Sequence, residues 1–87
     1  MNFELIKKSD YTLIVSSIEK IDATNAPELR DIFTQCQNNS NNKIIVDLSQ
    51  SKYCDSSGLS AILAGHRFCR DTNGTFIVAG AQPMGSN

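Results

Sequence analysis

Apolar residues alternate with polar ones on both sides of a short polar segment near the start of the chain. Phe3 and Leu5 precede the segment "KKSD", and Tyr11, Leu13 and Val15 follow it. Period-two spacing of this kind is typical of strands with one buried face. The pattern therefore predicts two strands joined by a short turn, which is a hairpin.

Helical spacing replaces this alternation in "IDATNAPELRDIFTQCQNNSNN". Asn25 is the expected N-cap, Pro27 lies in the first turn and Glu28 is the third helical residue. One apolar stripe then recurs at helical spacing: Ala26, Leu29, Ile32, Phe33 and Cys36. The segment "NNSNN" is polar and has no periodicity, so the helix is expected to end there.

Two short, nearly continuous apolar runs come later, "KIIVDL" at 43–48 and "TFIVAG" at 75–80. Such runs are typical of strands that are covered on both faces, as in a parallel sheet. Between them we expect a helix that begins near Asp55 and ends at "TNG", where Gly74 takes the left-handed cap. The order β-β-α-β-α-β predicts an α/β fold with helices packed on a mixed sheet.

The second helix carries two apolar stripes, from the rotation of about 100° per residue. The stripe with the larger side chains is expected to lie on the sheet: Leu59, Ile62, Leu63, His66 and Cys69. The other stripe contains small residues and one aromatic: Ala61, Ala64, Gly65 and Phe68. A surface helix needs only one apolar face, so this second stripe is interpreted as a contact for another helix or a partner protein.

Composition narrows the functional classes. The 87 residues suit one domain, 1–87. Eight basic and nine acidic residues give a net charge of -1 without any Lys/Arg block, so nucleic acid and anionic membrane are not the expected partners. The apolar runs are too short to cross a bilayer, and "MNFELIKKSD" lacks the pattern of a secretory signal. Three cysteines without a disulfide framework favour a reduced, cytoplasmic setting.

The segment "DSSG" places two hydroxyl groups where the second helix begins. With Asp55 as N-cap, Ser56, Ser57 and Gly58 fill the first turn, where free N–H groups and the positive end of the helix dipole are concentrated. Helix capping alone accounts for these residue types. Alternatively one serine accepts a phosphate, which a helix N-terminus stabilises and which adds about -1.5 to -2 charges. The residue types by themselves leave both interpretations open.

Around "IIVDLSQSKYCDSSGLSAIL" the sequence resembles the STAS domain, and more narrowly the bacterial anti-sigma factor antagonists. The similarity is strongest over 44–63 and extends to "IDATNAPELR" and "GTFIVAG". The resemblance implies a STAS-like mixed sheet and phosphorylation of the first serine in the signature, Ser56. It also implies a set of flanking residues close to that site: Asp22, Asp55, Ser57 and Gly58.

The resemblance further implies a binding switch in transcription regulation, with no catalytic residue and no cofactor. The unphosphorylated protein binds an anti-sigma factor that is also a serine kinase, and the sigma factor is released. The kinase then phosphorylates the antagonist and ejects it, and a PP2C-type phosphatase resets it. An alternative within the same fold is an accessory or regulatory subunit of a stress-signalling complex or of a lipid-transport ABC system, without phosphorylation switching.

Two features depart from the family pattern. Cys54 stands where antagonists often have Met, and one soft apolar side chain replaces another there. Family members usually continue with a further strand and helix beyond "TFIVAG", whereas this chain ends at "MGSN". Three explanations remain open: C-terminal truncation, a divergent short form, or a homodimer in which a second copy covers the exposed surface.

Two other site chemistries are disfavoured. A nucleophilic Ser56 needs a base, but His66 lies about 15 Å away along the helix. A zinc site built on His66 and Cys69, with Cys36 or Cys54, lacks a Cys-x-x-Cys pair, and these positions fit a core stripe. We therefore expect no metal site and no enzymatic activity.

Overall fold

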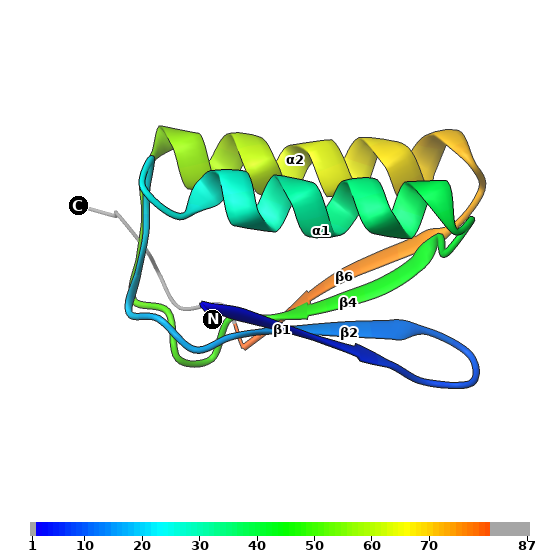
Figure 1. Cartoon of the computed structure of the whole chain (residues 1–87), viewed down its shortest axis with the longest axis horizontal. Coiled ribbons are helices and arrows are strands. Elements are labelled where there is room, and N and C mark those ends of the chain that lie inside the picture. The colour runs from blue at the N-terminus through cyan, green and yellow to red at the C-terminus, as the bar shows by residue number, and fades with distance from the viewer. Residues whose placement is uncertain (1, 81–87) are drawn as a thin grey trace.

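A four-stranded mixed sheet carries two helices on one of its faces (Figure 1). The computed structural model describes residues 2–80. Its elements, in chain order, are β1 (Phe3–Lys7), β2 (Thr12–Ser16), β3 (Lys20–Ile21), α1 (Ala26–Asn38), β4 (Lys43–Asp47), β5 (Tyr53–Cys54), α2 (Ser56–Asp71) and β6 (Thr75–Ala79). The α/β class and the predicted order are confirmed, and the short strands β3 and β5 are added to it.

The strands of the main sheet follow the order β1-β2-β4-β6. β1 and β2 are antiparallel, with Phe3 opposite Ser16, so the predicted hairpin is confirmed. β2, β4 and β6 are parallel to one another, and α1 and α2 lie within the connections between them. Parallel neighbours require such long connections, which accounts for helices between these strands.

The core lies between the sheet and the two helices. The whole predicted stripe of α1 is buried: Ala26, Leu29, Ile32, Phe33 and Cys36. Ile14, Ile44 and Val46 meet it from the sheet and are at most 1% exposed. Burial of one such side chain contributes roughly 1.5–3 kcal/mol relative to leaving it in water. This contact holds α1 on the sheet and fixes where its N-terminus lies.

The prediction for the two stripes of α2 was wrong. Leu59 and Leu63 were expected on the sheet but are 53% and 41% exposed, and His66 is exposed as well. Of that stripe only Ile62 and Cys69 are buried. Both stripes are apolar, and helical spacing alone does not say which one meets the core.

The stripe of small residues faces inward instead. Ala61 is fully buried and Gly65 is buried, while Ala64 and Phe68 are half-buried. A Cβ atom added at Gly65 would lie 2.7 Å from the Phe33 ring, so the two helices approach closely at this glycine. Phe68 packs against the core cluster. This stripe was interpreted as a contact for another helix or for a partner protein. In the structure it contacts another helix, which is α1.

The strands β4 and β6 are also less enclosed than predicted. Both helices lie on the same face of the sheet (Figure 1). Ile45 is partly exposed and Ile77 is 47% exposed on the other face, so the expectation of cover on both faces was wrong for the described residues. An apolar run indicates a strand, but it does not by itself show that both faces are covered.

The end of α2 uses a different residue from the one predicted. Asn73, with φ of 58°, takes the left-handed conformation, and Gly74 does not. Asn is one of the residues that tolerate this conformation. Gly74 is needed for another reason, because a Cβ atom there would lie 2.0 Å from the carbonyl oxygen of Asn42.

The segment "MGSN", on which the prediction of a missing C-terminal strand and helix rests, lies outside the described residues. Within 2–80, no helix has the length and apolar character needed to span a bilayer.

Candidate functional site

Two short parallel strands bring Asp22 and Asp55 to the same end of the molecule. β3 pairs with β5 so that Ile21 lies opposite Cys54, and the N–H of Asp55 donates to the carbonyl of Ile21 over 3.0 Å. The two aspartates follow directly on these paired positions. Neighbouring strands lie about 4.8 Å apart, so the site has two adjacent acidic residues.

Asp55 caps α2, as the sequence predicts. Its backbone is extended, and its Oδ1 accepts a hydrogen bond from the N–H of Gly58 over 3.0 Å. The next residue, Ser56, is the first of the helix and is exposed, whereas Ser57 is half-buried. The first of the two hydroxyls is therefore the more accessible to an enzyme or a partner.

A glycine is required at position 58 because of close packing and not because of backbone flexibility. A Cβ atom at this position would lie 2.7 Å from both Cys54 Sγ and Ile21 Cγ2. The first turn of α2 therefore sits directly on β3 and β5. This contact fixes the position of Ser56 relative to Asp22.

Asp22 is held ionised by its own loop. Its Oδ1 accepts hydrogen bonds from the hydroxyl and the N–H of Thr24, and these bonds lower the pKa of the carboxyl group. The side chain of Asn25 accepts from the N–H of Asp22 and donates to the carbonyl of Lys20. Asn25 is the N-cap of α1 by position, but its side chain orders this loop and does not cap the helix.

A hollow of about 340 Å³ separates the starts of the two helices. Ser56, Ser57 and Ser60 line it from α2, and Pro27 and Arg30 line it from α1. The guanidinium group of Arg30 donates a hydrogen bond to the hydroxyl of Ser60. Sequence reasoning missed Arg30, because its partner is 30 residues away and no local pattern links the two.

The exposed apolar residues of α2 lie on the same side as Ser56. Leu59 and Leu63 follow it by three and seven residues, which is one face of a helix. Of the residues predicted for partner contact, Ala61 and Gly65 are buried and Phe68 packs against the core, while Ala64 is half-buried. Ser56, Leu59 and Leu63 therefore offer an exposed surface that a second protein can reach without separating the helices.

A buried pair of hydroxyls fixes the loop that leads to the site. Ser51 Oγ donates to the carbonyl of Ile18 over 2.7 Å and lies 2.7 Å from Ser16 Oγ. Both serines are 0% exposed. The pair ties the end of β2 to the segment between β4 and β5, and so supports the position of Asp55.

Replacing Ser51 with alanine is expected to lower the free energy of unfolding by about 1–2 kcal/mol, because Ser16 and the carbonyl of Ile18 lose a buried partner. Urea denaturation followed by circular dichroism measures the change. The exposed Ser9 is the control, and its alanine variant is expected within about 0.5 kcal/mol of the wild type. Equal stability of the two variants would contradict a structural role for the pair.

The environment of all three cysteine thiols favours their neutral form. Burial raises the pKa of the Cys36 thiol and, together with the proximity of Cys36, raises that of Cys69 to about 11. Burial, and to a lesser extent Asp55, also raises the pKa of Cys54. Among residues 2–80, no three His, Cys, Asp or Glu side chains are grouped closely enough to hold a metal ion.

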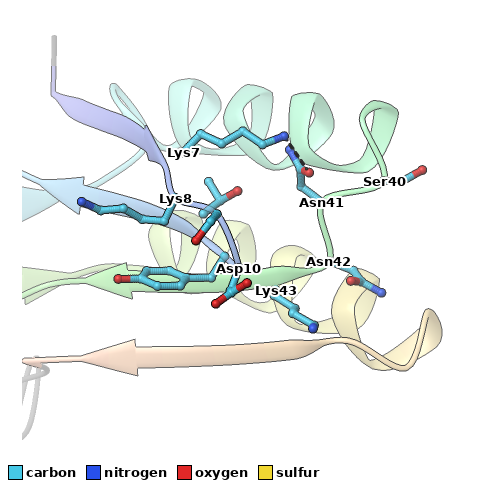
Figure 2. Close-up of a pocket in the computed structure, with 10 residues that line it drawn as sticks. Lys7, Lys8, Asp10, Ser40, Asn41, Asn42 and Lys43 are labelled. Carbon is cyan, nitrogen blue, oxygen red and sulfur yellow. Dashed lines mark hydrogen bonds between the residues drawn. The ribbon is translucent and has the colours of Figure 1, made fainter.

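A second hollow, of about 150 Å³, lies at the opposite end of the sheet, beside the β1–β2 turn and the end of α1. Lys7, Lys8 and Lys43 contribute to its lining, and Lys7 Nζ donates to Asn41 Oδ1 over 3.0 Å. Figure 2 shows that the three ammonium groups point in different directions. They do not converge on one point as a site for a single small anion requires.

The sequence and the fold together identify the family of this chain. The model of the STAS domain matches residues 4–86, and the chain belongs to the STAS domain family. No curated protein matches it significantly in sequence. The resemblance to the STAS domain, and with it the fold class, is therefore confirmed.

Solved structures with a similar fold include an anti-sigma factor antagonist from Mycobacterium paratuberculosis. It is 22% identical, with a TM-score of 0.79, and the match covers 95% of this chain and 69% of that one. The antagonist SpoIIAA in its unphosphorylated form is 19% identical, with a TM-score of 0.80, over 93% of this chain and 74% of that one. SpoIIAA from Bacillus in the phosphorylated form gives the same values.

Proposed function

We propose that this protein is an anti-sigma factor antagonist that is switched by phosphorylation of Ser56. The observation that carries the proposal is the exposed hydroxyl of Ser56 at the first residue of α2, on the same face as the exposed Leu59 and Leu63. Unmodified, the protein binds an anti-sigma factor serine kinase through this face and so frees a sigma factor. A PP2C-type phosphatase restores this form after phosphorylation.

Charge explains how phosphate ends the binding. Asp22 and Asp55 already lie at this end of the molecule, and a phosphate adds about -1.5 to -2 charges beside them. A partner that packs an apolar or acidic surface against Leu59 and Leu63 then meets a desolvated, unpaired charge. Removing water from such a charge costs several kcal/mol. The complex is expected to dissociate.

The scaffold tolerates the phosphate. Free N–H groups and the positive end of the dipole of α2 favour an anion at its first residue, by about 0.3–1 kcal/mol at an exposed site. The equal TM-scores to unphosphorylated and phosphorylated SpoIIAA support a switch that acts without a change of fold. Arg30 lines the same hollow as Ser56. Its guanidinium group is expected to give up its hydrogen bond to Ser60 and to bind the phosphate instead.

The test is the intact mass of the purified protein after incubation with Mg-ATP and an extract of its own cells. We expect a gain of one phosphate group, absent in Ser56→Ala and retained in Ser57→Ala. The second variant is a matched control because both serines lie in the first turn of α2. The reason for the difference is accessibility, since Ser57 is half-buried.

Retention of the phosphate in Ser56→Ala would overturn the assignment of the site. Absence of any phosphate, under conditions where the protein still binds partners from that extract, would favour the accessory or regulatory subunit instead. In that case Ser56 belongs to a permanent docking surface.

A further inference from the structure

The face of the main sheet that points away from α1 and α2 carries an ordered pattern. No element within residues 2–80 covers it (Figure 1). Side chains on alternate positions of each strand point to this face. One row of apolar residues crosses all four strands, as the pairing register shows: Ile6 opposite Leu13, Leu13 opposite Ile45, and Ile45 opposite Ile77. Ile77 is 47% exposed, and the other three are partly exposed.

The rows on either side of this apolar row differ in charge. The row nearer the end of β4 contains two acids: Glu4, Val15, Asp47 and Ala79. The row nearer the start of β4 extends the pairing of Thr12 with Ile44 by one position and contains two lysines: Lys8, Tyr11, Lys43 and Thr75. Lys8 joins that row because its N–H donates to the carbonyl of Tyr11 over 2.8 Å. Figure 2 shows Lys8 and Lys43 at this end of the sheet.

The charged side chains of these two rows are available for contacts with another molecule. Glu4, Lys8 and Lys43 are exposed, and none of them forms a salt bridge within residues 2–80. A hydrogen bond from the N–H of Ser49 lowers the pKa of Asp47, so that this carboxylate stays ionised at neutral pH. The row on one side of the apolar row is therefore acidic and the row on the other side is basic, with the exposed Asp10 in the turn next to the basic row (Figure 2).

The pattern of acidic, apolar and basic rows is self-complementary. Two copies of the face can be related by a twofold axis that lies between them and runs parallel to the apolar row. This axis places the apolar row of one copy on the apolar row of the other. It also places the acidic row of each copy opposite the basic row of the other. Asp47 then faces Lys43 of the second copy, and Glu4 faces Lys8 of the second copy. Each of these pairs occurs twice. The strands of the two sheets remain aligned, which is a common way for sheets to pack face to face, about 10 Å apart.

We propose that this sheet face binds a second copy of the same chain and forms a symmetric dimer with the layers helix, sheet, sheet, helix. The occupant is a second copy because this surface, used on both sides, places acid opposite base and apolar residues opposite apolar ones. Ser56 belongs to the helix layer, which stays on the outside (Figure 1). The dimer is thus independent of the proposed phosphorylation switch and leaves both switch sites open.

The experiment is sedimentation equilibrium of the wild-type protein and of three variants, Glu4→Lys, Lys8→Glu and the double exchange. We expect a concentration-dependent dimer for the wild type. Each single reversal replaces two opposite-charge contacts by two like-charge ones and is expected to weaken the dimer at least about tenfold. The double exchange is expected to restore the dissociation constant to within about threefold of the wild type.

Restoration is diagnostic because residues 4 and 8 lie about 13 Å apart along one chain and do not pair within it. Circular dichroism is expected to be the same for all four proteins, since both side chains are exposed. As a separate probe of the apolar row, Ile77→Lys is expected to abolish the dimer. A monomer at every concentration, a dimer that is insensitive to the reversals, or a double exchange that stays as weak as the singles would each overturn the proposal.

Discussion

Replacing Gly65 with leucine is expected to lower the free energy of unfolding by about 3 kcal/mol and the Tm by roughly 10–20 °C. The Cβ atom alone would lie 2.7–2.9 Å from three atoms of the Phe33 ring. That ring is only 4% exposed and packs edge to face on Phe76, so it has no free space to move into. α1 and α2 must separate to accommodate the new side chain. Thermal and urea denaturation measure the loss.

Ala64→Leu is the matched control, because it introduces the same side chain at the neighbouring position of α2, where the native residue is half-buried. We expect its stability to remain close to that of the wild type. A second variant, with Phe33→Leu added to Gly65→Leu, is expected to recover part of the loss because a smaller side chain then faces residue 65. If Gly65→Leu is as stable as Ala64→Leu, the close contact between the helices does not exist in solution.

Replacing Leu63 with glutamate is expected to weaken binding of the anti-sigma factor at least about 100-fold without unfolding the protein. This expectation rests on the proposed function. Leu63 is 41% exposed and follows Leu59 by one helical turn. A glutamate there places a charge in the apolar centre of the contact, while the helix retains a favourable residue type. Isothermal titration calorimetry with the purified anti-sigma factor measures the effect.

Ile77→Glu is the control for this change. Ile77 is exposed to a similar degree, 47%, but lies on the outer face of the sheet, away from α2. Its glutamate variant is expected to bind the anti-sigma factor like the wild type and to lose the dimer. Leu63→Glu is expected to show the opposite combination. Equal effects of both variants on either measurement would refute the assignment of two separate surfaces.

The order of the two helices and the four strands of the main sheet was predictable because each of them is specified locally, whereas the short strands β3 and β5 were not predicted. Alternation specifies β1 and β2, apolar spacing specifies α1, and the segment around Asp55 specifies where α2 begins. Capping of α2 by Asp55 was predictable for the same reason, since the side chain and the N–H that it binds are three residues apart. The exposure of Ser56 follows from its position at the helix start.

Other features of the site depend on contacts between distant segments. The pairing of β3 with β5 places Asp22 beside Asp55, although 33 residues separate them in the chain. The hydrogen bond from Arg30 to Ser60 likewise joins α1 to α2. Neither contact leaves a local pattern. The family resemblance indicated Asp22 as a residue close to the site, but nothing in the sequence indicated Arg30.

The sequence by itself determined the two helices, the four strands of the main sheet and the hydroxyl of Ser56 at the start of α2, because these depend on neighbours a few residues apart. Only the tertiary structure decided which stripe of α2 is buried. The small side chain of Gly65 admits Phe33, and this leaves Leu59 and Leu63 outside. Periodicity gives the angle between two stripes around a helix axis. The complementary shape of a second helix decides which of them turns inward.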